Sequence, residues 1–123
     1  MKILFDQGTP LPIRAFLKGH FVRTAFQEGW SALRNGDLIA AAEASGFHLL
    51  LSTDRNLRYQ QNLSQRLIAI LVIDLQQWPA LEPYVHEVVE AVDTIPPGGF
   101  LELNLRRHSA MNPAAENQTP PDR

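Results

Sequence analysis

Three aspartates are the residues of this chain best suited to chemistry. Asp6 directly follows the apolar run of residues 2–5, Asp54 directly follows the run of residues 49–53, and Asp37 opens a helix-like segment between them. If both runs are strands of one parallel sheet, Asp6 and Asp54 emerge at its carboxyl edge, where open α/β sheets place their sites. Converging carboxylates repel each other, and a bound divalent cation relieves that repulsion. The pattern therefore predicts metal-dependent chemistry and favours a phosphodiester substrate.

Each aspartate also has a structural interpretation. Asp6 could start a turn, although a glycine and two prolines already supply turn chemistry there. Asp54 could cap the helix that follows it. Asp37 in a helix's first turn would interact with the helix dipole, worth about 0.3–1 kcal/mol. We favour the functional interpretation for Asp6 and Asp54, and for Asp37 both stay open.

The elements that must position these acids alternate between strand and helix. Apolar runs predict strands over residues 2–5, 20–25, 47–53, 67–73 and 101–105. Helical spacing and capping residues predict helices over residues 12–17, 37–45, part of 56–65, and 81–92. This order predicts an α/β fold, a three-layer sandwich with a mainly parallel central sheet in which Leu4, Leu50 and Ile70 are buried.

The length, net charge and composition of the chain limit the class of protein. The 123 residues suit one domain, assigned to residues 1–105, and the polar, proline-containing residues 106–123 are expected to form a disordered tail. A net charge of −2 requires any nucleic-acid binding to use a local patch. The absence of cysteine excludes disulfides, thiolate zinc sites and cysteine nucleophiles. No apolar run is long enough to span a bilayer and no signal peptide is apparent, so we expect a soluble, cytoplasmic protein.

Candidate substrate contacts follow Asp54. Arg55 and Arg58 could hold phosphates at the rim of the site, and Tyr59 could stack on an unpaired base, a contact worth about 1–3 kcal/mol. An ordinary solvated helix face explains the same residues and is the slightly favoured interpretation. Asp74 also follows an apolar run and could approach the cluster if that strand lies next to the first.

Four segments together resemble a known family. They are the opening Met1-Lys2-Ile3-Leu4-Phe5-Asp6-Gln7, the triplet Asn35-Gly36-Asp37 before an alanine-rich helix, Ser52-Thr53-Asp54-Arg55-Asn56-Leu57, and Arg58-Tyr59-Gln60-Gln61-Asn62-Leu63. In order and spacing, over roughly residues 1–105, they resemble the PIN-like nucleases, and in particular the compact DUF5615 group.

The resemblance implies a PIN-type fold, an acidic cluster that binds Mg²⁺ or Mn²⁺, and hydrolysis of RNA, often as the toxin of a toxin–antitoxin pair with an antitoxin protein as partner. Asp6, Asp37 and Asp54 match the family's acidic positions. The family's fourth acidic position falls near Asn56, which can bind a metal through its carbonyl oxygen but brings no charge.

Two functions therefore remain open. The first is a metal-dependent endoribonuclease whose metal-activated water attacks RNA. The second is a degenerate PIN-like binding module without turnover, favoured by Asn56. A phosphotransfer receiver is rejected, because Asp6 is followed by Gln7 instead of a second acid and no lysine follows the last strand. The alternating leucines of residues 101–105 predict an edge strand and, through it, a homodimer.

Overall fold

A computed structural model of the chain describes residues 1–59 and 66–106 and shows an α/β fold around one parallel sheet. The strands lie in the order β2-β1-β3-β4-β5, and all four neighbouring pairs are parallel. Their bounds are β1 Lys2–Phe5, β2 Phe21–Thr24, β3 Leu49–Ser52, β4 Ala69–Ile73 and β5 Phe100–Leu103. The parallel sheet predicted from the apolar runs is confirmed.

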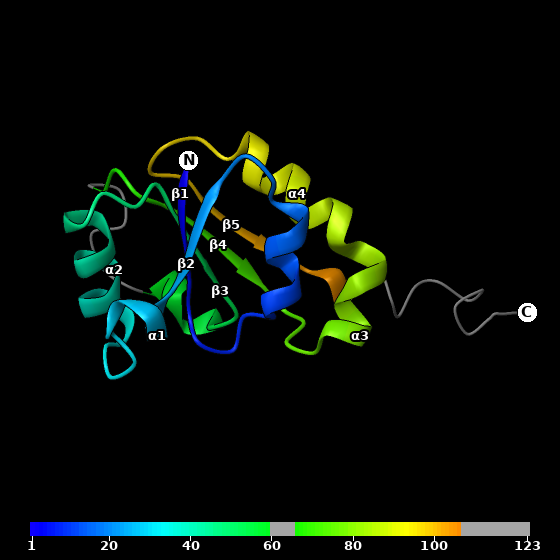
Figure 1. The fold of residues 1–123 in the computed structure, drawn as a ribbon, viewed down its shortest axis with the longest axis horizontal. Coiled ribbons are helices and arrows are strands. Elements are labelled where there is room, and N and C mark those ends of the chain that lie inside the picture. The colour runs from blue at the N-terminus through cyan, green and yellow to red at the C-terminus, as the bar shows by residue number, and fades with distance from the viewer. Residues whose placement is uncertain (60–65, 107–123) are drawn as a thin grey trace, which may run out of the picture.

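Helices lie on both sides of this sheet. Figure 1 shows α1 and α2 on one side and α3 and α4 on the other. The α-helices are α1 Ala25–Glu28, α2 Asn35–Ala44, α3 Trp78–Leu81 and α4 Val85–Thr94. Shorter 3₁₀ helices are η1 Leu11–Phe16, η2 Arg55–Tyr59 and η4 Glu82–Tyr84. This arrangement is compatible with the expected three-layer sandwich.

The strands bury their side chains in two hydrophobic cores, with successive residues of a strand entering different cores. Leu4, Leu50 and Ile70, expected to be buried, are fully inaccessible and belong to the core that also contains α2 residues. Their chain neighbours, such as Phe5 and Leu51, belong to the second core, together with residues of η1 and α4. The alternation explains why these strands are apolar on both faces, since a sheet covered by helices on both sides has no wet face.

The strand order places a topological switch point beside β1. The chain continues from β1 outward to β2 and then crosses to β3 on the other side of β1. This 2-1-3-4-5 order is one of the two common doubly wound orders, and ligands bind where the connections diverge. Phe5 is paired with Leu51, and the Asp6 backbone N–H donates to the Leu51 carbonyl at 2.9 Å. The segments that follow β1 and β3 therefore leave the sheet side by side.

Three local predictions were wrong in detail. Residues 11–16 form a 3₁₀ helix instead of an α-helix: it is short, with a proline in its first turn, and the Leu17 N–H bonds three residues back, to the Arg14 carbonyl. The second strand ends at Thr24, because Thr24 caps the unexpected helix α1. The last strand was predicted to reach Leu105 but ends at Leu103. Leu105 is buried in a helical turn beyond β5, because the Asp74 carboxylate accepts the backbone N–H groups of Leu105 and Arg106.

Residues 107–123 of the expected tail lie outside the described part of the chain, as do residues 60–65. Arg106, where that tail was expected to begin, is tied to the fold through Asp74. Among the helices of the described ranges, none has the length and apolar character needed to cross a membrane.

Candidate functional site

A polar pocket of about 360 Å³ opens at the carboxyl edge of the sheet, at the switch point between β1 and β3. Four segments that are distant in sequence supply its walls: the residues after β1, the approach to α2, the residues after β3, and the loop after β4. The lining residues are Asp6, Gln7, Leu33, Arg34, Asn35, Thr53, Asp54, Arg55, Asn56 and Gln76. The sheet topology thus gathers carboxylates, amides and guanidinium groups in one place.

Asp6 is the half-buried acid of this pocket. Its Oδ1 accepts the Gln7 backbone N–H at 2.7 Å, and its Oδ2 accepts the Ser52 hydroxyl at 2.7 Å. Burial raises the pKa of the Asp6 carboxyl; the two hydrogen bonds and the nearby charge of Arg34 oppose this rise, and the charge of Asp54 adds to it. The carboxylate is held in one orientation. A positive charge placed beside it would favour its charged form.

Ser52 links the two acids. This fully buried residue ends β3, donates its hydroxyl proton to Asp6, and accepts the Asp54 backbone N–H at 3.0 Å. The Asp54 Oδ1 in turn accepts the Asn56 N–H at 2.9 Å, an Asx-turn that begins η2. Asp54 therefore has the expected structural role, and it also lines the pocket with Asp6.

Asp37 does not lie with the other two acids. It is exposed in the first turn of α2 and is absent from the pocket lining. Within residues 1–59 and 66–106, no three His, Cys, Asp or Glu side chains are grouped closely enough to hold a metal ion. The expected convergence of three carboxylates is not found, and the site has two.

The remaining predicted residues divide into three groups. Arg55 and Asn56 line the pocket with Asp6 and Asp54. Arg58 and Tyr59 belong to η2, but their side chains lie outside the described part of the structure, so their contact with substrate stays a prediction. Asp74 follows β4, which β3 separates from β1, and its carboxylate caps the turn after β5 instead.

Asn35 and Arg34 also line the pocket, and neither was a predicted site residue. Asn35 has a positive φ of 49°, a strained conformation that asparagine tolerates better than most residues. Its Oδ1 is buried and has no hydrogen-bond partner in the described part of the chain. The dipeptide Asn35-Gly36 before a helix was a visible turn signal. Nothing in the sequence showed that this turn faces Asp6.

A glycine brings the two loops of the site together. Gly8 has a φ of 87°, and a Cβ at this position would lie 3.1 Å from the Thr53 Oγ1. A side chain there would strain the backbone and also press against the loop that carries Asp54. The approach of the β1 loop to the β3 loop therefore depends on Gly8.

The donor set of the pocket fits a divalent cation of the magnesium class. Mg²⁺ and Mn²⁺ prefer oxygen ligands and are commonly held by one or two carboxylates together with waters. Asp6 and Asp54 supply two carboxylates, Asn56 and Asn35 supply amide oxygens, and the Asn35 Oδ1 lacks a partner among the described residues. Asp6 and Asp54 are therefore the residues that would hold such an ion.

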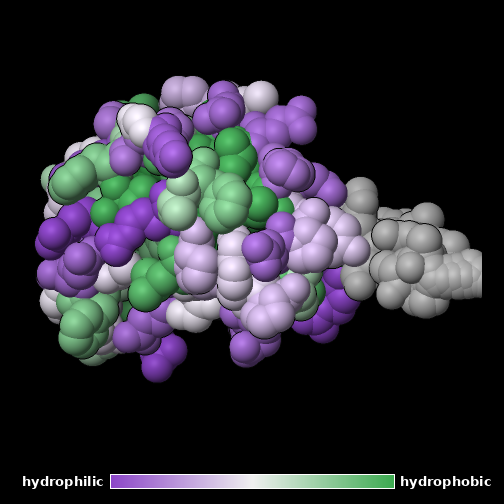
Figure 2. Space-filling view, turned by 45° about the vertical axis from the view of Figure 1, so that its right-hand side comes forward, coloured by the Kyte–Doolittle hydropathy of each residue, from purple (hydrophilic) through white to green (hydrophobic). Residues whose placement is uncertain are grey.

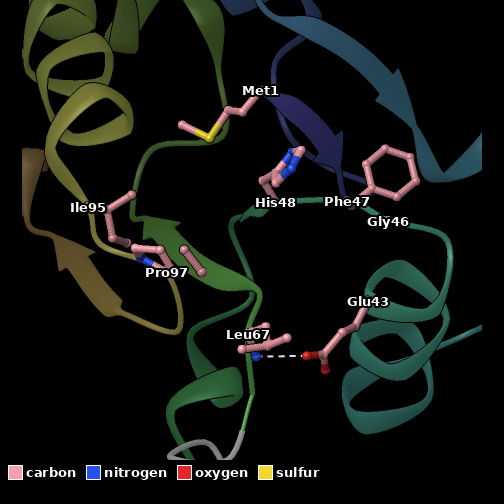
Figure 3. Close-up of a pocket in the computed structure, with 9 residues that line it drawn as sticks. Met1, Glu43, Gly46, Phe47, His48, Leu67, Ile95 and Pro97 are labelled. Carbon is pink, nitrogen blue, oxygen red and sulfur yellow. Dashed lines mark hydrogen bonds between the residues drawn. The ribbon is translucent and has the colours of Figure 1, made fainter.

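A further pocket of about 350 Å³ lies at the opposite, amino edge of the sheet (Figure 3). Its walls are mainly apolar and include Met1, Phe47 and Leu67. Its one carboxylate, Glu43, accepts the Leu67 backbone N–H at 2.7 Å and so has a structural partner. This pocket offers no cluster of reactive groups.

Comparison with known proteins identifies no relative: no family model, no curated protein and no solved structure matches the chain.

Proposed function

We propose that this protein is a metal-dependent endoribonuclease whose site is the polar pocket at the switch point. The observation that carries the proposal is the meeting of Asp6 and Asp54 with Arg34 and Arg55 in one pocket at the carboxyl edge. Carboxylates suit a divalent cation, and guanidinium groups suit the phosphate of the substrate. Toxin activity within a toxin–antitoxin pair, with an antitoxin protein as partner, is the biological setting that the sequence resemblance suggests.

The chain's own groups have defined tasks in this proposal. Asp6 and Asp54 bind a Mg²⁺ or Mn²⁺, which when bound supplies a Lewis acid and lowers the pKa of a coordinated water. Ser52 and the Gln7 N–H hold the Asp6 carboxylate in one orientation, so little reorganisation accompanies binding. Arg34 and Arg55, which form no ion pair within the described ranges, are available to bind the phosphate oxygens.

The second candidate is a binding module that retains the RNA-binding pocket without turnover. Two observations favour it: Asp37 lies outside the pocket, and Asn56 stands where the resembled family often has an acid. With two acids and two arginines, the pocket is close to neutral without a metal. It could then hold a phosphodiester by the guanidinium groups alone.

Cleavage of a fluorogenic single-stranded RNA in Mg²⁺ or Mn²⁺ separates the two candidates. If the protein is a nuclease, the native chain cuts the RNA, and the variants Asp6→Asn and Asp54→Asn do not. The control variant Glu90→Gln, which changes an exposed acid of α4, should cut as the native chain does. Equal cleavage by native protein and Asp6→Asn would refute the mechanism. RNA binding without cleavage, with activity gained in Asn56→Asp, would identify the native chain as the binding module.

A further inference from the structure

A second pocket adjoins the polar one and shares Asp6 and Gln7 with it. It has a volume of about 460 Å³ and lies between the turn after β1 and the start of α1. That volume is within the range of about 300–1,000 Å³ that is usual for small-molecule sites. Its lining differs from that of the polar pocket, because it is mainly apolar and includes Leu11 and Phe26.

Phe26 is the most unusual residue of this lining. Its side chain is 77% exposed, although its neighbour Ala25 is buried in the core. An exposed phenylalanine beside a polar site presents a flat apolar face that a ligand can contact. Leu11, 54% exposed, is a second apolar residue of the same lining.

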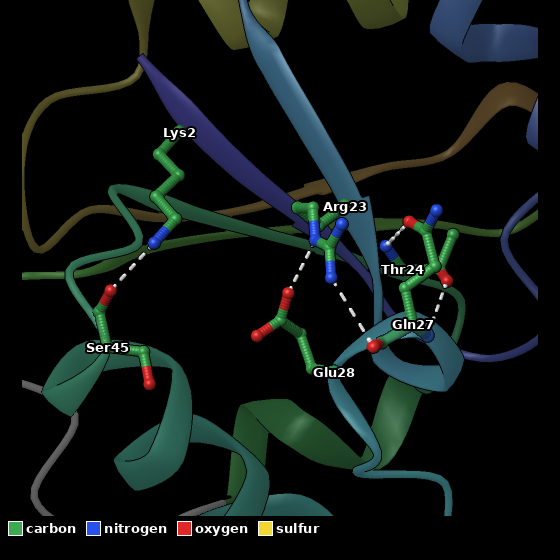
Figure 4. Close-up of polar contacts among 6 residues, drawn as sticks. All are labelled: Lys2, Arg23, Thr24, Gln27, Glu28 and Ser45. Atoms are coloured by element: carbon green, nitrogen blue, oxygen red, sulfur yellow. Dashed lines mark hydrogen bonds and ion pairs between the residues drawn. The ribbon is translucent and has the colours of Figure 1, made fainter.

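The short helix that carries Phe26 is held by several polar contacts (Figure 4). Thr24 and Gln27 form a reciprocal capping box, with hydrogen bonds of 3.0 and 2.9 Å. Arg23 donates from Nε to Glu28 at 2.6 Å, which ties the strand before α1 to the end of α1. Phe26 is therefore presented from a fixed backbone, and a ligand that contacts it need not order the helix first.

We propose that this second pocket binds one unpaired nucleobase, stacked on Phe26, of a strand whose adjacent phosphate lies in the polar pocket. The inference rests on the proposed function and deepens it, because it names single-stranded RNA as the substrate class. A nucleotide joins a charged phosphate to a flat base, and the two adjoining pockets offer arginines on one side and an aromatic residue on the other. Bases within a duplex are stacked on one another and do not expose a face to an aromatic side chain.

Polar groups in the lining of the second pocket suit the edge of a base. Gln7 is exposed and lines both pockets, and its amide can donate and accept hydrogen bonds. The Thr24 hydroxyl accepts the Gln27 N–H, so its own proton remains available as a donor. A purely apolar partner, such as the leucine face of another protein, would leave these groups unpaired.

Binding of fluorescein-labelled RNA hexamers, followed by anisotropy in the presence of a chelator so that metal-dependent cleavage does not remove the RNA, tests the proposal. Phe26→Ala should weaken binding by about 5- to 150-fold, the range for loss of one base–aromatic stack. Phe26→Tyr should restore binding because it keeps the ring. Phe21→Ala is the matched control: Phe21 is also an exposed phenylalanine, 58% accessible, and does not line the pocket.

A series of hexamers, each lacking one base, identifies the contact. One abasic hexamer should bind the native protein as weakly as the complete hexamer binds Phe26→Ala, and it should be insensitive to that substitution. If Arg34→Ala and Arg55→Ala weaken RNA binding but Phe26→Ala does not, the base pocket is refuted and the proposed function stands. If Phe26→Ala changes only the oligomeric state, the surface is a protein interface and the inference is wrong. If native protein binds no RNA, both proposals fail.

Discussion

At the scale of single residues, the carboxylate of Asp6 determines how the site behaves without metal. Its pKa is raised by burial, so folding favours the protonated form. The stability gained from that form is fully present below the unfolded-state pKa, near 4, and is lost as the pH rises through the folded-state pKa. At neutral pH, without a divalent cation, the charged Asp6 should therefore reduce the free energy of unfolding.

Asp6→Asn should accordingly raise the melting temperature at pH 7 in the presence of a chelator, and this gain should shrink below about pH 4, where native Asp6 is protonated in both states. Differential scanning fluorimetry at the two pH values measures the difference. Asp37→Asn, which alters an exposed carboxylate, should give no such gain. A lower melting temperature for Asp6→Asn at pH 7 would mean that its hydrogen bonds outweigh the cost of burial.

Ser52 carries the second residue-scale prediction. Ser52→Ala removes the hydroxyl that binds the Asp6 carboxylate and leaves the Asp54 N–H without its acceptor. We expect a loss of about 1–3 kcal/mol in the free energy of unfolding, measured by urea denaturation. Ser45→Ala is the control, because Ser45 is exposed at the end of α2 and the substitution keeps its backbone carbonyl, which accepts from Lys2. Equal stability of the two variants would contradict the role assigned to Ser52.

At the scale of elements, the sequence predicted best where one local pattern decides the structure. β3 and β4 were predictable because continuous apolar runs suit buried parallel strands. The end of α2 was predictable because a glycine, Gly46, follows it, and this glycine adopts the left-handed conformation that commonly ends a helix. The positions of Asp6 and Asp54 followed from the ends of their strands. Asn35 and Arg34 could not be found in this way, because their approach to Asp6 depends on how the loop before α2 folds across the sheet edge.

The turn after β1 provides the element-scale prediction. Gly8→Ala should destabilise the protein more than Gly19→Ala, because both glycines have a φ near 90° but only Gly8 would also place a Cβ 3.1 Å from a neighbouring loop. The left-handed strain alone is worth about 1–2 kcal/mol. Any further decrease in the free energy of unfolding of Gly8→Ala, measured by denaturation, reports the contact with Thr53. Equal losses would show that the two loops of the site move apart freely.

At the scale of the whole molecule, the sheet ends in two edges, β2 and β5, and apolar side chains are exposed near both. Figure 2 shows hydrophobic patches among hydrophilic side chains on one face of the molecule. Leu101 on β5 is 37% exposed, and unpaired edges favour association. The homodimer through β5 therefore stays a prediction.

Light scattering coupled to size exclusion tests this prediction. The native protein should be a dimer, and Leu101→Lys should convert it to a monomer, because a charge on an edge strand opposes pairing. Phe21→Lys, at the other edge, should leave the dimer intact. A native protein that is monomeric at high concentration would refute the dimer.

The central claim is that Asp6 and Asp54 together form one site for a divalent cation. Titration with Mn²⁺, followed by the loss of its free-ion signal in electron paramagnetic resonance, tests this claim without depending on turnover. We predict that the native protein and Glu90→Gln bind Mn²⁺ alike, and that Asp6→Asn and Asp54→Asn each bind it much more weakly, because each substitution removes one of the two charged ligands of the pocket. Equal Mn²⁺ affinity of the native protein and both aspartate variants would contradict the claim.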